Sequence, residues 1–418
     1  MNFLNYIVNM VSKIVNFLSS KNKTISQHNI PLSYLTRFLS TFILIMPVRI
    51  LWMQQTLSNS QISILTGWLF ISIVIFELPT GAFADLVGKK ITLLISYLVY
   101  ALSMILYLWA TDFLQFGIAI TLQSLAEALQ SGAEDALIYD SLAEDGLENN
   151  FKVINAKVMT VNQFGLIGAT FAGGLLGSFN LKFPFIGFTI ILIISAIISS
   201  FMKEPSIDTE KFTLKNYYRQ IVDGTKQIFK HSRLIKLTLL YTLVGGISWT
   251  FQRLLRDMIL ISVGYQQLSL GLITGTFRLI NIIFLAKLAK SVKANNGKWD
   301  ILFLPIIMIM SYIPGFWLNH WNSLPLVAGI MMIGTGRFLI LNPYLHQEIE
   351  SKYRATAMSA ANLFVSLFLG INMIGLGFIL DKVGIPKVML TYGLVSIFVV
   401  LPLAWEVRKE ILLARNYQ

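Results

Sequence analysis

Long apolar runs, one after another, constrain this chain more than any other feature of its sequence. Each run has roughly 20 residues with few charges, the length that an α-helix needs to cross a lipid bilayer. Only 13% of the 418 residues are charged and 55% are hydrophobic, whereas ordinary soluble domains have roughly 25% charged residues. So few polar side chains cannot cover a folded surface of this size in water. The sequence therefore predicts an all-α membrane protein.

The runs form two sets of six, separated by a polar stretch at 204–233. A short stretch before the second run of each set is similar, Gln61 to Ile64 in the first and Gln267 to Leu270 in the second. Matching halves predict two pseudo-symmetric six-helix bundles with twelve transmembrane helices. The predicted spans are 31–54, 61–83, 90–110, 113–140, 153–178, 184–202, 234–258, 266–288, 300–318, 322–346, 355–379 and 387–405.

The segments outside the spans predict the orientation. Most of the 33 Lys and Arg residues fall on one side of the predicted spans. Membrane proteins keep an excess of Lys and Arg in their cytoplasmic loops, so this side is predicted to be cytoplasmic. The same excess explains the net charge of +12, and we expect no nucleic acid as a partner. Both termini are then cytoplasmic. Residues 1–30 have apolar side chains at helical spacing and no cleavage site, which favours an amphipathic helix on the membrane surface over a disordered tail. We expect bundles at 31–203 and 234–405, a cytoplasmic linker at 204–233 and a cytoplasmic tail at 406–418.

Missing residue types exclude several chemistries. The chain has no Cys, which removes disulfides, thiolate metal sites and cysteine nucleophiles, and its four His residues are too far apart in sequence to suggest a metal cluster. It also has no phosphate-binding loop of the type found in ATP-driven pumps. We therefore expect neither an enzyme nor a bound metal or cofactor.

A ten-residue motif, GAFADLVGKK at 81–90, ends the second span. Its first glycine lets two helices approach closely, and its second permits a tight turn. The carboxylate between them is placed to cap a neighbouring helix, and the two lysines are expected to anchor the loop on the cytoplasmic side. We predict a conformational gate that consists of Glu77, Gly81, Asp85, Gly88, Lys89 and Lys90.

This motif resembles the loop signature of the major facilitator superfamily, G-x-x-x-D-R/K-x-G-R/K-R/K, although Leu86 replaces a basic residue. The preceding stretch at 76–80 is similar to that of bacterial drug-efflux members. The fifth span has Gly165, Gly173 and Gly174, a weakened form of the antiporter signature, and close packing alone also requires such residues. The resemblance implies the major facilitator fold and a monomeric drug:proton antiporter in the bacterial plasma membrane.

Ionisable side chains inside spans are expensive and are therefore functional candidates. The span 113–140 has a polar stripe at helical spacing that we expect to face a water-filled cavity. Glu127 lies near the predicted bilayer centre, where it exchanges a proton, forms an ion pair with Arg37 or contacts the substrate. The candidates for proton coupling are Glu127, Glu134 and Arg37. The stripe consists of Gln123, Glu127, Gln130, Ser131 and Glu134.

Two arginines, Arg278 and Arg337, lie inside later spans and far from helix ends. They are candidates either for binding an anionic substrate or for balancing the acids of the polar stripe. A further group near the outer ends of two spans, Arg49, Arg253 and Arg256 with Asp257, forms either an outer gate or a set of side chains that reach the membrane interface. The candidates for lining a substrate cavity are Gln123, Gln130, Trp249, Arg278 and Arg337.

These observations predict a secondary transporter that works by alternating access and binds a small-molecule substrate and protons in a lipid bilayer. The leading hypothesis is proton-coupled efflux of lipophilic or cationic drug-like compounds. The alternative is a carrier for another solute, either an anionic metabolite or an amphipathic lipid. A membrane-embedded enzyme or a receptor is disfavoured, because the sequence offers no nucleophile, no metal cluster and no sizeable soluble domain.

Overall fold

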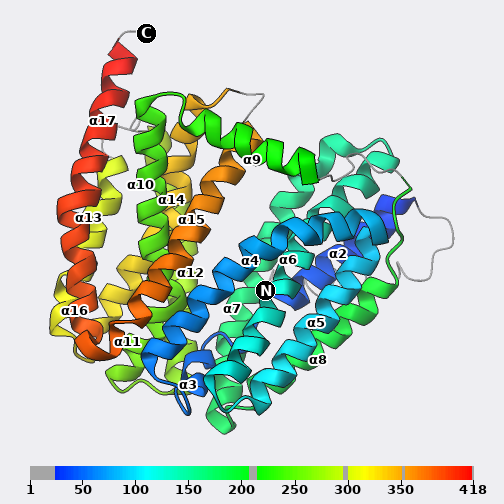
Figure 1. Ribbon diagram of the computed structural model, residues 1–418, viewed down its shortest axis with the longest axis horizontal. Coiled ribbons are helices and arrows are strands. Elements are labelled where there is room, and N and C mark those ends of the chain that lie inside the picture. The colour runs from blue at the N-terminus through cyan, green and yellow to red at the C-terminus, as the bar shows by residue number, and fades with distance from the viewer. Residues whose placement is uncertain (1–23, 207–213, 295–299, 351–353, 417–418) are drawn as a thin grey trace.

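The computed structural model describes residues 24–206, 214–294, 300–350 and 354–416. These residues form helices and connecting turns, with no strand among them, and the helices stand in two bundles side by side (Figure 1). Within the described part, nine helices are long and apolar enough to cross a membrane. The predicted all-α fold of two bundles is confirmed, and the helix plan is consistent with twelve crossings.

The first bundle follows the chain from blue to green in Figure 1. It contains α2 (Ile25–Thr41), α3 (Arg49–Met53), α4 (Asn59–Val87), α5 (Lys89–Trp109), α6 (Phe113–Glu144), η1 (Glu148–Asn150), α7 (Phe151–Phe179) and α8 (Phe183–Ser200).

The second bundle contains crossings that are divided by short 3-10 or π-helical turns. Its elements are α10 (Ser232–Thr250), η2 (Phe251–Leu255), α11 (Arg256–Ser262), α12 (Gln267–Ala294), α13 (Asp300–Tyr312), η3 (Pro314–Trp317), α14 (Ser323–Glu348), α15 (Arg354–Gly377), α16 (Leu380–Val395), η5 (Ser396–Val400) and α17 (Leu401–Asn416).

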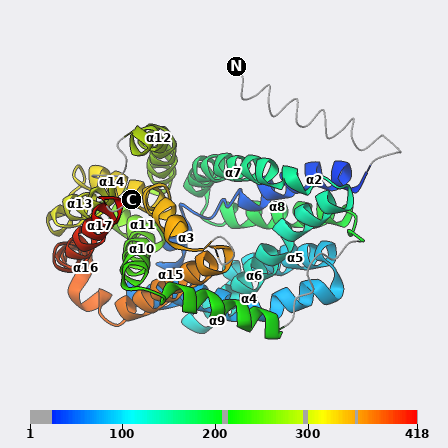
Figure 2. The same ribbon diagram turned by 90° about the horizontal axis from the view of Figure 1, so that it is seen from above.

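The segment between the bundles contains a helix, α9 (Leu214–Ile228), which lies across one end of the molecule against α15 (Figures 1 and 2). We call this end the linker face and the opposite end the far face. Gly224 of α9 fits against the carbonyl of Thr356, where a Cβ would lie 2.5 Å from the oxygen. The two ends of the first and last predicted spans also differ from the structure. Helix α2 begins at Ile25, inside the predicted amphipathic segment 1–30, and α17 continues to Asn416, through most of the predicted tail 406–418. Residues 1–23 of the predicted amphipathic helix lie outside the described residues.

The first predicted span, 31–54, is divided into two helices. Residues 42–48 form successive turns, and α3 begins only at Arg49. The glycines of α7 make this possible, because a Cβ at Gly173 would lie 2.0 Å from the Leu44 carbonyl and one at Gly165 would lie 2.6 Å from the Thr41 hydroxyl. Irregular backbone is tolerated within a membrane where protein buries it or where it lines a cavity. The glycines that resemble an antiporter signature therefore have a packing role here.

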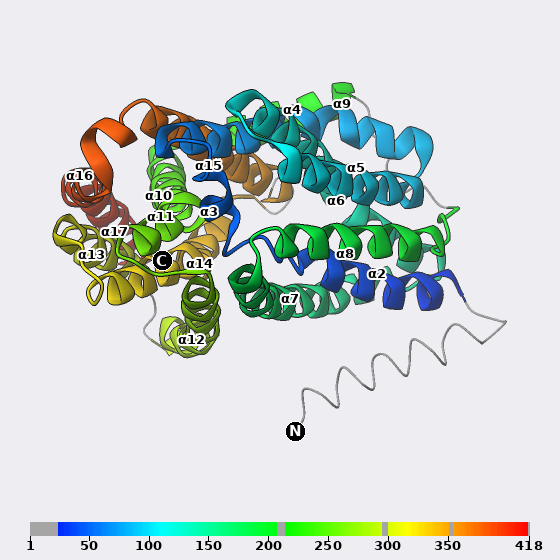
Figure 3. The ribbon, with the colours of Figure 1, turned by 90° about the horizontal axis from the view of Figure 1, so that it is seen from below.

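The bundles contact each other through small residues in the halves nearer the far face. A Cβ at Gly67 of α4 would lie 2.7 Å from the Gly370 carbonyl of α15, and Gly174 of α7 packs directly on Gly271 of α12. Ser63 Oγ also donates a hydrogen bond of 2.7 Å to the Met373 carbonyl. These contacts join the two bundles near the far face, and Figure 3, seen from that face, shows α4 beside α15 and α7 beside α12.

Candidate substrate and proton site

Glu134, a buried acidic residue of α6, belongs to an ion cluster inside the first bundle. Arg37 Nε of α2 lies 2.6 Å from Glu134 Oε2, and the same guanidinium pairs with Asp135. Tyr97 Oη and Gln130 Nε2 each donate a hydrogen bond of 2.8 Å to Glu134 Oε1. Glu134 is only 4% exposed. These contacts make Glu134 part of a structural ion cluster between α2, α5 and α6.

Glu127 lies two turns away in a different environment, and the predicted ion pair between Glu127 and Arg37 is wrong. The helix register of α2 places Arg37 beside Glu134 instead. Glu127 is half-buried and accepts hydrogen bonds from Gln123 Nε2 at 2.8 Å and from Tyr100 Oη at 3.2 Å. Tyr107 Oη in turn donates to Gln123 Oε1 at 3.1 Å. Among the described residues, Glu127 therefore has neutral hydrogen-bond donors and no ion pair.

The three tyrosines on α5 were not among the predicted site residues. Tyr97, Tyr100 and Tyr107 are spaced by three and seven residues, so they lie on one face of the helix. All three are buried and point their hydroxyls at the α6 stripe. The stripe therefore packs largely against α5, and only Ser131 and the neighbouring Gly132 are well exposed. Their regular spacing in an apolar span is the sequence signal that could have identified them.

Arginines gather where the two bundles meet near the far face. Arg49 Nη2 of the first bundle donates a hydrogen bond of 3.1 Å to the carbonyl of Arg253 in the second. Arg278 Nη2 of α12 lies 3.0 Å from Met46 Sδ in the irregular segment. Arg256 differs from these, since it forms a buried ion pair with its neighbour Asp257. Of the arginines in the hypothesised gate, Asp257 therefore pairs directly only with Arg256, although it also lies within electrostatic reach of Arg278.

The other intramembrane arginine, Arg337 of α14, is fully buried inside the second bundle. Its guanidinium lies 4.3 Å from the centroid of the Tyr241 ring, 4.4 Å from that of Phe338 and 5.0 Å from that of Trp249. Gly245 leaves the space, because a Cβ there would lie 1.5 Å from Arg337 Nη1. In this conformation Arg337 and Trp249 contact each other and do not reach the α6 acids.

The gate motif has the predicted turn but different charge contacts. Gly88 has a φ of 99°, which favours glycine. The Glu204 carboxylate caps α5 by accepting hydrogen bonds from the backbone N–H groups of Lys89 at 2.6 Å and Lys90 at 2.8 Å. The Lys89 side chain turns inward and pairs with the buried Asp140, so it does not anchor the loop at the surface. The remaining gate residues, all in the last turns of α4, are Glu77, Gly81 and Asp85.

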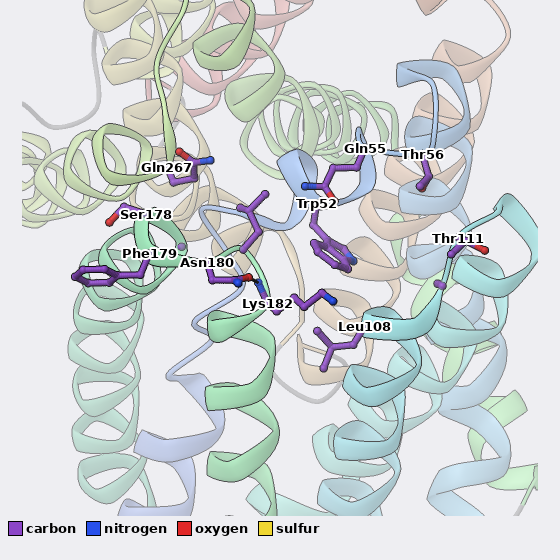
Figure 4. Close-up of a pocket in the computed structure, with 13 residues that line it drawn as sticks. Trp52, Gln55, Thr56, Leu108, Thr111, Ser178, Phe179, Asn180, Lys182 and Gln267 are labelled. Carbon is purple, nitrogen blue, oxygen red and sulfur yellow. Dashed lines mark hydrogen bonds between the residues drawn. The ribbon is translucent and has the colours of Figure 1, made fainter.

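A hollow of about 620 Å³ opens on the far face between the helix connections of the first bundle (Figure 4). Trp52, Thr111 and Asn180 line it, Gln267 comes from the second bundle, and Lys182 is its one charged residue among those described. It contains none of the predicted site residues. We therefore place the candidate site at the α6 stripe and the interface arginines.

Comparison with known proteins decides the family. The sequence matches the Major Facilitator Superfamily over residues 32–371. The chain belongs to the Major Facilitator Superfamily. It is 25% identical over 354 residues to YxaM, an uncharacterized MFS-type transporter of Bacillus subtilis (strain 168), and the match covers 81% of this chain and 83% of YxaM. A multi-pass membrane transporter is therefore shown.

Solved structures share the fold. The nucleoside transporter NupG has a TM-score of 0.71 at 16% identity, with 92% of this chain and 98% of NupG covered. A D-xylose-proton symporter has a TM-score of 0.67 at 13% identity, with 90% of this chain and 96% of the symporter covered. Identities this low show the fold alone. The drug-efflux branch and antiport stay predictions.

Proposed function

We propose that this transporter works by alternating access and couples the movement of its solute to protons through Glu127. The observation that carries the proposal is the contrast between two acids on one helix. Glu134 has an arginine within 2.6 Å, whereas Glu127 is held by Tyr100 and Gln123. An acid in a direct ion pair has a structural role, whereas an acid that has only neutral partners is the better candidate to exchange a proton during the cycle.

Position supports the same residue. Glu127 is within electrostatic reach of Arg253, which belongs to the other bundle. When two bundles rock against each other around a central site, the distance between such groups changes. A cation that approaches Glu127 favours the ionised form and one that withdraws favours the protonated form, so proton binding and conformation become linked.

The predicted cytoplasmic termini make the far face extracellular, in which case the bundles are in contact on the extracellular side. The placement of Lys and Arg residues supports this orientation. Efflux of lipophilic cations remains the hypothesis from the sequence. The arginines between the bundles favour the alternative, an anionic solute, because like charges repel a cationic one.

Proton coupling is tested in proteoliposomes that contain an internal pH dye. The panel consists of tetraphenylphosphonium, ethidium, phthalate and phenyl phosphate, with protein-free liposomes as the blank. We expect at least one compound to move protons with the wild type and Glu127→Gln to reduce that movement about tenfold or more. Glu148→Gln, at an exposed glutamate outside the spans, is the matched control. Undiminished proton movement by Glu127→Gln would overturn the coupling assignment.

A further inference from the structure

We propose that Arg49, Arg253 and Arg278 form the binding site for an oxyanion group, a carboxylate or a phosphate, on the transported solute. This inference rests on the proposed function, since it names the substrate class for the same interface. The guanidinium group suits this role because its fork of N–H donors matches the paired oxygens of carboxylates and phosphates.

The three arginines lie between the bundles and not against lipid. Arg49 of the first bundle bonds to the backbone of Arg253 in the second, and Arg278 of the second bundle contacts Met46 of the first. Arg253 is also 5.9 Å from the centroid of the Phe70 ring on α4. Each side chain thus crosses the interface, which is the place where a transporter of this fold holds its solute.

The charges at this interface do not balance. Arg256 is neutralised by Asp257, at distances of 2.7 and 3.0 Å. Arg49, Arg253 and Arg278 form no direct ion pair with a described carboxylate. Glu127 is within electrostatic reach of Arg253, and Asp257, already paired with Arg256, is within reach of Arg278. Three arginines and one glutamate leave two positive charges. Unbalanced charge inside a membrane is costly. A negatively charged solute would neutralise this excess positive charge and would therefore bind favourably.

Hydrogen-bonding capacity is left over as well. Arg278 Nε is buried and has no partner among the described residues, and Arg278 Nη2 contacts only the weak acceptor Met46 Sδ. Arg49 uses one Nη2 hydrogen for a carbonyl and also hydrogen-bonds to Tyr107. The exposed side chain of Arg253 lies near an aromatic face. An oxyanion between them would satisfy donors that the protein leaves open.

The backbone is arranged to present these side chains. Arg49 follows the irregular segment 42–48, and Arg253 lies on the π-helical turn η2. Breaks in membrane helices and π-helical turns both recur at binding sites, because they free backbone groups and redirect side chains. The two breaks face each other across the interface, where Arg49 and Arg253 are joined. Phe70 and Met46 add apolar surface for the body of the solute.

Binding is measured on purified protein in detergent by thermal stabilisation, at constant ionic strength set with sodium chloride. The probes are phthalate, phenyl phosphate and tetraphenylphosphonium. We expect at least one oxyanion to stabilise the wild type and tetraphenylphosphonium to have no effect. Arg253→Gln and Arg278→Gln should weaken the apparent Kd for that oxyanion about tenfold or more, since each removes a charge-assisted donor. Arg408→Gln, on α17 beside Trp405, is the matched control and should bind as the wild type does.

Arg253→Lys keeps the positive charge but lacks the planar guanidinium fork. It provides a second test in case the glutamine variants misfold. We expect its affinity to lie between those of the wild type and Arg253→Gln. The proposal is overturned if neither oxyanion stabilises the wild type, or if all three interface variants bind as tightly as Arg408→Gln. Which of phthalate and phenyl phosphate binds identifies the headgroup.

Failure here is separable from failure of the proposed function. Glu127→Gln should still bind the oxyanion, so lost proton coupling with intact binding would leave the arginine site standing. Proton-coupled movement of tetraphenylphosphonium with no oxyanion binding would support the proposed function and overturn the arginine site.

Discussion

Two intramembrane arginines, the half-buried Arg37 of the first bundle and the fully buried Arg337 of the second, are stabilised in different ways. Arg37 pairs with Glu134 and Asp135, whereas Arg337 lies among three aromatic rings and has no carboxylate partner among the described residues. A guanidinium is weakly hydrated and binds to aromatic faces, so either carboxylates or aromatic rings can stabilise it. Only the carboxylate partners of Arg37 place acids inside a bundle, and the proton-coupling candidates lie in that bundle.

The interface arginines have neither carboxylate partners like those of Arg37 nor an aromatic cluster like that of Arg337. Arg253 contacts one ring at 5.9 Å, and Arg278 contacts a thioether. A cation with weak protein partners at a bundle interface is available to a ligand, whereas Arg37 and Arg337 are already occupied. The comparison therefore separates structural arginines from candidate binding residues.

Replacing Arg37 or Arg337 tests this comparison most strongly and should give the largest changes in the free energy of unfolding. Arg37→Met leaves Glu134 buried without its cation and should lower the free energy of unfolding by about 3–5 kcal/mol. Arg337→Met leaves no opposite charge behind and should cost about 2 kcal/mol or less. Thermal and denaturant unfolding in detergent measures both. The double variant Arg37→Met with Glu134→Gln should recover part of the loss, and equal costs for the two single variants would contradict the distinction.

Packing around Arg337 gives the next largest effect. Gly245→Ala places a methyl group 1.5 Å from Arg337 Nη1, and the surrounding rings limit the movement of the guanidinium. We expect a cost of about 1–3 kcal/mol, as for other overpacked sites. Gly132→Ala is the control on α6, because a Cβ there meets nothing within 4 Å. It should be neutral or slightly stabilising, and similar losses for both variants in a melting assay would argue against a rigid aromatic cage.

The carboxylate that caps α5 should have a smaller effect. Glu204→Gln removes the charge that accepts from the Lys89 and Lys90 backbone, and we expect a cost of about 1 kcal/mol. Glu144→Gln tests a second acid near the linker, which accepts one backbone hydrogen bond from Ser206. Hydrogen exchange at the start of α5 is the readout, and unchanged exchange in Glu204→Gln would exclude the cap.

The smallest effect is expected at Asp145, outside the spans. Partial burial raises the pKa of this carboxyl, but hydrogen bonds from Ser26 and Thr24 outweigh it and hold the pKa below its ordinary value. A depressed pKa stabilises the fold at neutral pH, and that contribution is lost as pH falls below about 4. Asp145→Asn should therefore melt slightly earlier at pH 7, with the difference shrinking in acid. A difference that grows in acid would contradict this.

The sequence predicted the crossings because a bilayer demands long apolar helices, and it predicted the turn at Gly88 because a tight connection requires glycine. It did not predict the break at 42–48, since apolar content does not distinguish helix from irregular backbone that the glycines of α7 bury. The alternative in which Glu127 pairs with Arg37 is also wrong. Glu127 and Glu134 share one face of α6, and only the register between α2 and α6 decides between them.

The aromatic surroundings of Arg337 were beyond prediction for a similar reason. Tyr241 and Trp249 lie on α10, distant in sequence from α14, and nothing in either segment indicates that they meet at Gly245. Similarly, the sequence grouped Arg49 and Arg253 by their place near helix ends and could not decide between a gate and side chains that reach the membrane interface. Their contact arises from the way the two bundles pack.

The central claim is that the proton and the solute occupy different residues, Glu127 and the interface arginines. Proteoliposomes test it when exchange of labelled phenyl phosphate or phthalate, whichever binds, is measured beside proton movement in the same preparation. We predict that Glu127→Gln keeps exchange near the wild-type rate and loses proton movement, while Arg253→Gln loses both. Equal loss of exchange and proton movement in Glu127→Gln, or normal exchange in Arg253→Gln, would contradict the separation of the two sites.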